Sequence, residues 1–145
     1  MPNTAFIAVD FPAPLGPTIT AISPGFTAMV QSSSAVTALY FGGISLACEP
    51  CADTYAALLA REGVERAVMI DPNIRPELLG VDQVREICQP VLAQCDLLLP
   101  SGAEATMLTG SVDEETACRD LVGSGIAMVA LKRGAEGSTV FTANP

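Results

Sequence analysis

The decapeptide Ala67-Val-Met-Ile-Asp71-Pro-Asn73-Ile-Arg75-Pro76 joins a short apolar run to a cluster of polar side chains. An apolar run bounded by turn signals is typical of a buried strand in a parallel sheet. Pro72 and Pro76 then take the chain away from the ladder, because proline cannot donate a ladder hydrogen bond. We therefore predict a buried strand that is followed directly by a polar loop.

The polar residues of this loop have two interpretations. In open α/β sheets, ligands bind in the crevice beyond the carboxyl ends of the strands, where Asp71, Asn73 and Arg75 would lie. Asp, Asn and Pro also favour turns for conformational reasons alone, so the same residues fit a plain strand-to-loop turn. Residue types leave both interpretations open.

Segments typical of strands and of helices alternate on both sides of this decapeptide. Strands are predicted at residues 38–46, 67–70, 96–100, 126–132 and 138–142, the last as a hairpin arm after a tight turn at 134–137. Helices are predicted at residues 54–63, 84–92, 101–110 and 113–123. This alternation predicts a three-layer α/β/α sandwich with a mainly parallel sheet.

Glycine and proline set further local expectations. Gly42 and Gly43 allow a close backbone approach or a bulge at the end of the first strand. Gly63 is placed to end the first helix as its C-cap. Pro90 should kink the second helix or end it early.

Composition and charge limit the partners of the 145-residue chain. Half of the residues are hydrophobic, 16% are charged, and the net charge is −9 without a single histidine. A chain of this size forms one domain at most, and its acidity argues against nucleic acid and anionic membranes as partners. Without histidine, acid–base chemistry falls to Asp, Glu, Cys, Lys or Tyr.

Neither a membrane span nor an export signal is predicted. The sequence has no run of about 18 uninterrupted apolar residues, and no basic residue precedes its first apolar positions. Five cysteines, an odd number, fit a reduced protein better than a disulfide framework. We therefore expect a cytoplasmic protein.

Residues 1–36 differ from the remainder of the chain. They hold one charged residue, Asp10, and no hydrophobic period of a strand or a helix. We interpret them as a truncated, mistranslated or frame-shifted start, or else as a Pro-rich extended arm. No function is assigned to them, and residues 37–145 are taken as the domain.

Cys48-Glu-Pro-Cys51 has the form of a redox motif. It lies between a predicted strand and a predicted helix, and a helix N-terminus would stabilise a thiolate. Two small apolar residues at a helix start explain the pattern equally simply, and we favour that interpretation. Zinc fits less well, because no second CxxC and no histidine could complete four ligands.

Two motifs that follow later strands have a structural and a functional interpretation each. Glu104 has the capping-box spacing from Ser101, but a carboxylate at this place could also hold Mg²⁺ through water. Lys132-Arg133-Gly134-Ala-Glu-Gly137 combines two cations with glycines, which suits phosphate binding. Hairpins also use glycine for geometry alone.

Four segments form one ordered set: Phe41-Gly-Gly-Ile-Ser-Leu46, Asp71-Pro-Asn73-Ile-Arg75-Pro76, Leu99-Pro100-Ser101-Gly-Ala-Glu104 and Lys132-Arg133-Gly134-Ala-Glu-Gly137-Ser138. In this order and at these spacings, the chain resembles the PfkB, or ribokinase-like, family of carbohydrate kinases. It is most similar to the fructokinase and 2-keto-3-deoxygluconate kinase branch. The resemblance covers about residues 38–142, and the ordered set is more specific than any one motif.

The resemblance implies ATP-dependent phosphorylation of a hydroxyl on a sugar or sugar acid, with Mg²⁺ as the cofactor. It implies that Asn73 and Arg75 face the sugar or the transferring phosphate, and that Glu104 helps to organise the metal ion. The residues that would line the nucleotide site are Lys132, Gly134 and Gly137. It also allows a homodimer of the intact enzyme.

The chain departs from the family pattern. Ser101 stands where the family has the Asn of its N-x-x-E element, and the G-A-G-D element with the catalytic Asp is expected only beyond Pro145. The N-terminal substrate segment and lid strands are missing as well. We therefore expect an incomplete domain, a central fragment that is inactive alone and folds poorly. The alternatives are a non-catalytic nucleotide- or sugar-binding remnant and, less well supported, a thiol-disulfide oxidoreductase.

Overall fold

The computed structural model describes residues 38–43, 51–75, 77 and 80–143. The Pro-rich segment 1–36, residues 44–46 of the first predicted strand, and Cys48 lie outside the described residues. Cys51 is the first residue of a helix, and the predictions made for the CxxC motif stay predictions.

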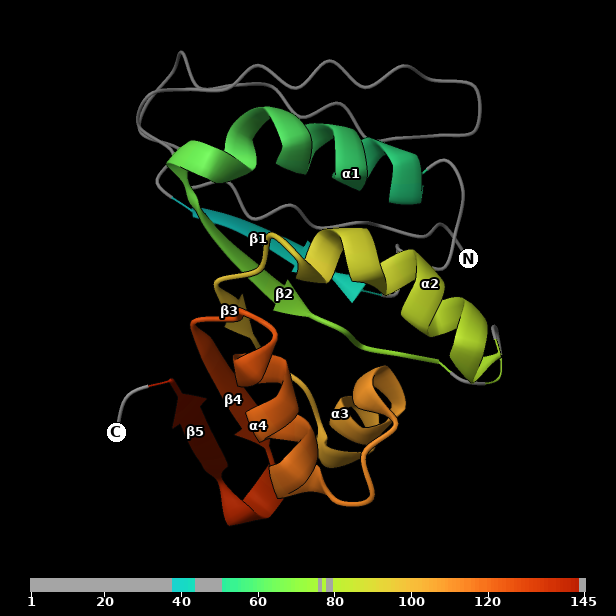
Figure 1. Cartoon of the computed structure of the whole chain (residues 1–145), viewed down its shortest axis with the longest axis vertical. Coiled ribbons are helices and arrows are strands. Elements are labelled where there is room, and N and C mark those ends of the chain that lie inside the picture. The colour runs from blue at the N-terminus through green and yellow to red at the C-terminus, as the bar shows by residue number, and fades with distance from the viewer. Residues whose placement is uncertain (1–37, 44–50, 76, 78–79, 144–145) are drawn as a thin grey trace.

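A five-stranded sheet forms the centre of the fold (Figure 1). Its strands follow the order of the chain, and the first four are parallel, whereas the last is antiparallel to its neighbour. The strands are β1 (Ala38–Gly42), β2 (Ala67–Asp71), β3 (Leu97–Leu98), β4 (Met128–Lys132) and β5 (Ser138–Thr142). The predicted parallel sheet and hairpin arm are thereby confirmed. β1 to β4 all end at one side of the sheet, which we call the carboxyl edge.

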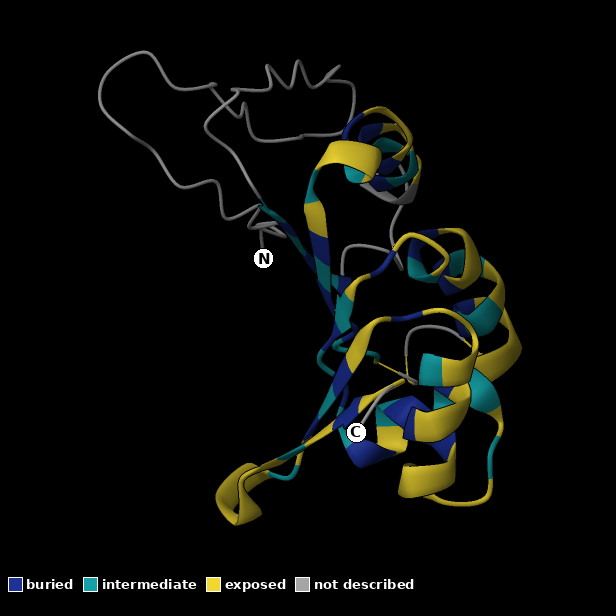
Figure 2. Ribbon diagram, turned by 60° about the vertical axis from the view of Figure 1, so that its left-hand side comes forward, coloured by how far each residue is buried: buried dark blue, intermediate teal, exposed yellow. Residues whose placement is uncertain are grey.

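Four helices connect the parallel strands and lie on one face of the sheet (Figure 2). They are α1 (Cys51–Glu62), α2 (Val81–Leu92), α3 (Gly102–Thr109) and α4 (Glu114–Gly123). Because crossovers between parallel strands are right-handed and the strand order runs in one direction, every crossover helix falls on the same side. The α/β fold class is confirmed, and the helices that the structure describes form one of the two helix layers of the sandwich. None of the described helices is long and apolar enough to cross a bilayer.

The core lies between the sheet and these helices. Alternate strand residues point into it, as the period of two requires, and Phe41 and Tyr55 pack edge to face with ring centroids 4.8 Å apart. The strand residues that are buried on this side are Leu39, Phe41, Val68, Ile70, Leu98, Val129, Leu131 and Phe141.

The opposite face of the sheet, which we call the open face, is also largely apolar. Tyr40, Met69, Leu97 and Met128 stand opposite one another across four strands in register. Met128 is 39% exposed and Val140 55% exposed, and none of the described helices covers them. An apolar sheet face of this kind normally packs against a further layer.

Two boundary predictions at the first strand and first helix are wrong. β1 ends at Gly42, earlier than predicted, whereas the predicted close backbone approach is confirmed, because a Cβ atom at Gly43 would lie 1.8 Å from the carbonyl oxygen of Pro72. α1 begins at Cys51, and Gly63 opens a short 3₁₀ turn without the left-handed conformation of a C-cap glycine. The chain turns there instead beside Glu62, whose buried carboxylate contacts both Arg61 and Arg66.

The helices predicted later in the chain agree better with the structure. α2 continues past Pro90 and ends two residues later at Leu92, so the proline lies in the last turn, where it removes one hydrogen bond. Asp113 is the N-cap of α4, and its carboxylate accepts a hydrogen bond from the backbone of Thr116 at 2.9 Å. Hydrogen bonds from the backbone and the side chain of Thr116 lower the pKa of the Asp113 carboxyl.

Three buried free thiols should make the fold less stable at alkaline pH. Burial raises the pKa of Cys88 to about 11 and that of Cys95 to about 12, and it also raises the pKa of Cys118. Above about pH 9 the unfolded chain releases these protons while the folded chain keeps them. The free energy of unfolding should therefore fall by on the order of 2 to 5 kcal/mol by about pH 11.

Denaturant unfolding at about pH 8 and about pH 11 measures this loss. The matched control is the double variant Cys88→Ala, Cys95→Ala, which is less stable at both pH values but should lose less between them. An equal loss in the two proteins would assign the alkaline sensitivity to other groups.

Candidate functional site

The sheet brings the predicted site segments to the carboxyl edge. Asp71 ends β2 and the Asn73–Arg75 loop follows it, while Ser101 follows β3 and Lys132 ends β4. Ser101 and Lys132 form a parallel bridge, and the Lys132 amide donates to the Pro100 carbonyl at 2.8 Å. Segments that lie far apart in the sequence thus end side by side.

Glu104 completes the predicted capping box at the start of α3. Its backbone N–H donates to Ser101 Oγ at 3.4 Å, and its own Oε2 accepts from the Ser101 N–H at 2.6 Å. The second oxygen, Oε1, accepts from the backbone N–H of Ile74 at 2.8 Å. The carboxylate therefore ties the start of α3 to the loop after β2, a contact across 30 residues that no local spacing could reveal.

The Asn73–Arg75 loop owes its shape to this tie. Asn73 adopts φ +41°, in the left-handed region, which asparagine tolerates better than most residues. Ile74 follows, donating its N–H to Glu104 and packing its side chain against the core. Arg75 is exposed at the end of the loop.

A second contact crosses the sheet on the open face. Lys132 Nζ lies 2.7 Å from Asp71 Oδ1, and the Tyr40 hydroxyl donates to Asp71 Oδ2 at 3.4 Å. Asp71 thereby links β1, β2 and β4 through side chains on the open face. Burial and the neighbouring Asp71 carboxylate raise the pKa of Tyr40. Lys132 was predicted as a nucleotide ligand, but its pairing with Asp71 was not predicted.

The turn between β4 and β5 requires both of its glycines. Gly134 and Gly137 have φ of +58° and +90°, and the Arg133 N–H donates to the Gly137 carbonyl at 2.8 Å. All four residues at 134–137 are exposed (Figure 2). Arg133 lies between Glu114 and Glu115 of α4, at 3.8 and 4.0 Å, so this cation is directed to the helix. Hairpin geometry alone explains the glycines, and a phosphate role remains a prediction.

The carboxylates at this edge suit a metal ion only as water-mediated ligands. Among the described residues, no three Asp, Glu, Cys or His side chains are grouped as a metal site would need. Each Glu104 oxygen accepts one backbone hydrogen bond and keeps further lone pairs. Mg²⁺ often retains several waters and takes one or two carboxylates together with substrate phosphates, and Glu104 fits that mode.

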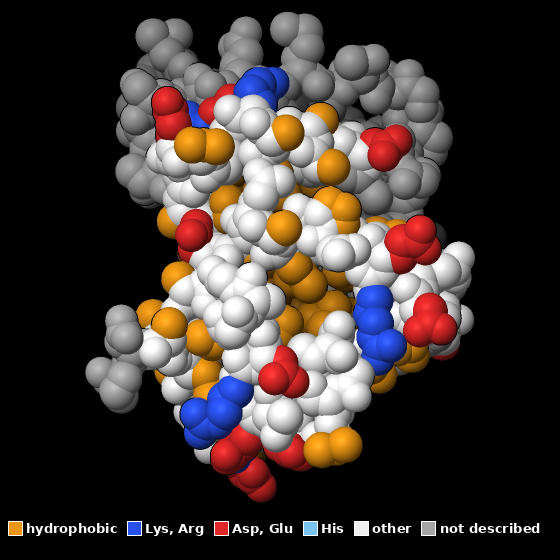
Figure 3. Space-filling model, in the orientation of Figure 1, with side chains coloured by type: hydrophobic (Ala, Val, Ile, Leu, Met, Phe, Trp, Pro, Cys, Tyr) orange, Lys and Arg blue, Asp and Glu red, His pale blue; other side chains and the backbone are white. Residues whose placement is uncertain are grey.

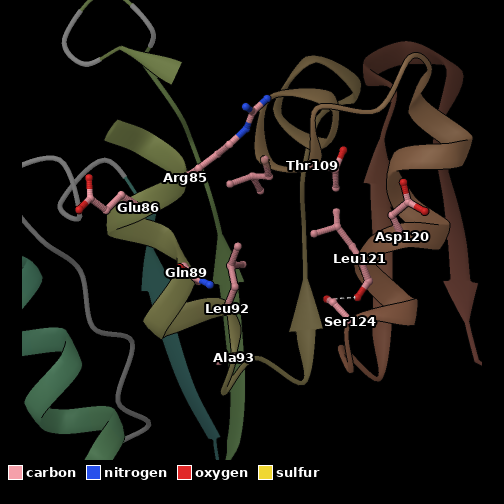
Figure 4. A pocket seen from close by; sticks show the side chains of 10 residues that line it. Arg85, Glu86, Gln89, Leu92, Ala93, Thr109, Asp120, Leu121 and Ser124 are labelled. Carbon is pink, nitrogen blue, oxygen red and sulfur yellow. Dashed lines mark hydrogen bonds between the residues drawn. The ribbon is translucent and has the colours of Figure 1, made fainter. Parts of the chain in front are cut away.

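A groove elsewhere on the molecule shares none of the predicted site residues. It has a volume of about 610 Å³ and lies between α2 on one side and α3 and α4 on the other (Figures 3 and 4). Its apolar lining includes Leu92, Leu108 and Leu121, and its rim includes Arg85 and Asp120. Because it shares no residue with the carboxyl edge, we interpret it as an unfilled seam between helices.

Replacing Glu104 tests the tie between α3 and the loop. Glu104→Ala leaves the Ile74 and Ser101 amides without their acceptor, and it should lower the free energy of unfolding by about 2 kcal/mol. Ser101→Ala removes only the cap and should cost about 1 kcal/mol. Glu136→Ala, in the exposed turn, is the neutral control. Denaturant unfolding measures the free energy of unfolding of each variant. Equal losses for Glu104→Ala and Ser101→Ala would show that the bond to Ile74 adds nothing to stability.

Comparison with known proteins assigns the chain to a family. Residues 20–144 match the family described as pfkB family carbohydrate kinase. The match covers most of the chain, and it includes every segment of the carboxyl edge described above. The protein belongs to the PfkB family of carbohydrate kinases.

Individual relatives are sugar and nucleoside kinases. The chain is 33% identical over 107 residues to a fructokinase of Rhizobium leguminosarum bv. trifolii, which is 72% of this chain and 32% of that protein. The crystal structure of aminoimidazole riboside kinase from Salmonella enterica, complexed with aminoimidazole riboside and an ATP analogue, is 25% identical. It has a TM-score of 0.63, over 73% of this chain and 36% of the kinase.

Fructokinase from Vibrio cholerae O395, in the form that binds fructose, ADP and calcium ion, is also 25% identical. Its TM-score is 0.64, over 100% of this chain and 50% of the kinase. The chain therefore spans about a third to a half of the length of the relatives it matches.

Proposed function

We propose that this chain is the central segment of an enzyme that phosphorylates a hydroxyl of a sugar or sugar acid with ATP. The observation that supports it best is the meeting of the Asp71, Ser101 and Lys132 segments at one carboxyl edge. Ligands of open α/β sheets bind at such an edge. Membership of the PfkB family and the substrates named for the relatives supply the chemistry.

The residues of the carboxyl edge divide into three groups under this proposal. Asn73 and Arg75 contact the sugar or the transferring phosphoryl group, and the guanidinium neutralises the charge of phosphate oxygens through paired hydrogen bonds. The residues that line the nucleotide site are Lys132, Gly134 and Gly137. Glu104 holds Mg²⁺ through water, and the bound ion supplies further neutralisation of phosphate charge.

The 145-residue chain by itself should not turn over. The two carboxylates that the described contacts place at the edge are both engaged, Asp71 with Lys132 and Glu104 with two backbone amides. Neither is free to take the proton of a substrate hydroxyl. The open face of the sheet likewise calls for a further layer, which we expect from additional residues of a longer kinase polypeptide.

The intact mass of the protein in its source, together with an ATP-dependent phosphorylation assay on a panel of sugars and sugar acids, tests the proposal. We expect a polypeptide much larger than 15.0 kDa that carries these peptides and consumes ATP with one of the sugars. A 15.0 kDa product that binds nucleotide without turnover would favour a binding remnant. Loss of a thiol-dependent reductase activity in Cys51→Ser, without kinase activity, would favour the oxidoreductase.

The charge and the thiols of the chain indicate the partners and the compartment of the proposed enzyme. The net charge of −9 supports small molecules as partners rather than nucleic acid or anionic membranes. Buried, unpaired thiols at Cys88, Cys95 and Cys118 fit a reducing cytoplasm. The family resemblance allows a homodimer of the intact enzyme, and sedimentation of that enzyme tests for it.

A further inference from the structure

Asp71 has no role in the proposed function, yet it makes the closest charged contact at the carboxyl edge. Its Oδ1 lies 2.7 Å from Lys132 Nζ, across β3 and 61 residues away in the sequence. Its Oδ2 accepts the weaker bond from Tyr40 at 3.4 Å. The carboxylate thus takes one of the three N–H donors of the Lys132 ammonium, for which a phosphate oxygen would compete.

The pair is open to a ligand. The Lys132 side chain is 44% exposed and the Asp71 side chain 24% exposed, on a face that none of the described helices covers. Arg133, the neighbouring cation, is directed to Glu114 and Glu115 of α4. Lys132 is therefore the cation at the end of β4 that an incoming anion can reach, and Asp71 already neutralises it.

We propose that Asp71 is an internal counter-ion that competes with the phosphates of the nucleotide for Lys132. This inference rests on the proposed function of Lys132. A ligand of high charge density, such as a triphosphate, displaces the single carboxylate, whereas a monophosphate gains less from the exchange. Asp71 then discriminates among phosphates and holds Lys132 in place while the site is empty.

The direction in which one substitution changes the affinity for phosphate tests this proposal. Asp71→Asn keeps the shape and removes the charge, and it should tighten the binding of inorganic tripolyphosphate to the full chain roughly three- to tenfold. A merely structural Asp71 predicts the opposite, a loss of affinity through misplacement of Lys132. Asp71→Ser should show the same gain, which keeps the test valid where the first variant folds poorly.

Isothermal titration calorimetry with tripolyphosphate measures these affinities, and two further variants serve as controls. Glu65→Gln removes one carboxylate before β2, at the opposite edge of the sheet, and should leave the affinity within twofold of wild type, roughly the size of a screened surface effect. In a Lys132→Met background, Asp71→Asn should lose most of its gain.

The outcomes separate the two proposals. Unchanged or weaker binding in both Asp71 variants, with wild-type binding that Lys132→Met abolishes, overturns the counter-ion and leaves the nucleotide site standing. Absence of binding in every variant, including wild type, contradicts both the counter-ion and the assignment of Lys132 to a phosphate site.

Discussion

Arg75→Ala is expected to lower the kcat of the complete kinase by about 10²- to 10³-fold, the usual loss when one preorganised charge-stabilising donor is removed. Arg75 is exposed in the loop whose Ile74 amide is held by Glu104, so its backbone has a defined place at the carboxyl edge. Phosphoryl transfer depends on positioning and charge neutralisation, which this side chain would supply. Steady-state kinetics with the preferred sugar measure the loss.

Two arginine variants give this test its controls. Arg75→Lys keeps the charge but loses the planar, two-pronged donor, and should recover only part of the rate. Arg119→Ala removes the same kind of side chain from α4, where it lies 5.7 Å over the Phe141 ring, and should leave kcat nearly unchanged. Equal rates for Arg75→Ala and Arg119→Ala would remove Arg75 from the site.

Gly43→Ala should lower the free energy of unfolding by about 3 kcal/mol, at the upper end of the usual cost of overpacking. The new Cβ would lie 1.8 Å from the Pro72 carbonyl oxygen, and backbone atoms cannot yield as a flexible side chain can. The end of β1 would then have to separate from the loop that carries Asn73 and Arg75.

The neighbouring glycine is the matched control for this substitution. A Cβ at Gly42 meets nothing within 4 Å, so Gly42→Ala should change stability by less than about 0.5 kcal/mol. Denaturant unfolding of both variants gives the comparison. Similar stabilities would mean that the close approach of Gly43 to Pro72 does not constrain the fold.

Local patterns in the sequence were sufficient for most elements of the fold. The apolar run before Asp71 predicted β2, the Ser101 and Glu104 spacing predicted the capping box, and the turn at 134–137 predicted the β4–β5 hairpin. Each of these signals depends on residues a few positions apart. The Gly63 prediction was wrong: α1 runs into a 3₁₀ turn at Gly63, beside the contacts of Glu62 with Arg61 and Arg66, instead of ending at a left-handed glycine.

The contacts that shape the candidate site could not be predicted in this way. Glu104 binds Ile74 across 30 residues, and Asp71 binds Lys132 across 61. Such pairs depend on strand order and register, which place chain segments side by side only after the sheet has formed. The ordered set of family motifs predicted a site at the carboxyl edge, but it did not reveal that two of its charged groups pair with each other.

In the proposed kinase, ATP binds at the carboxyl edge, beside Lys132 and the Asn73–Arg75 loop. The most direct measurement is an NMR titration of the isotopically labelled full chain with a non-hydrolysable ATP analogue and Mg²⁺. We expect the amide shifts to concentrate at residues 132–137 and 73–75. Shifts confined to the groove lined by Leu92, Leu108 and Leu121, or no shifts at saturating analogue, would contradict it.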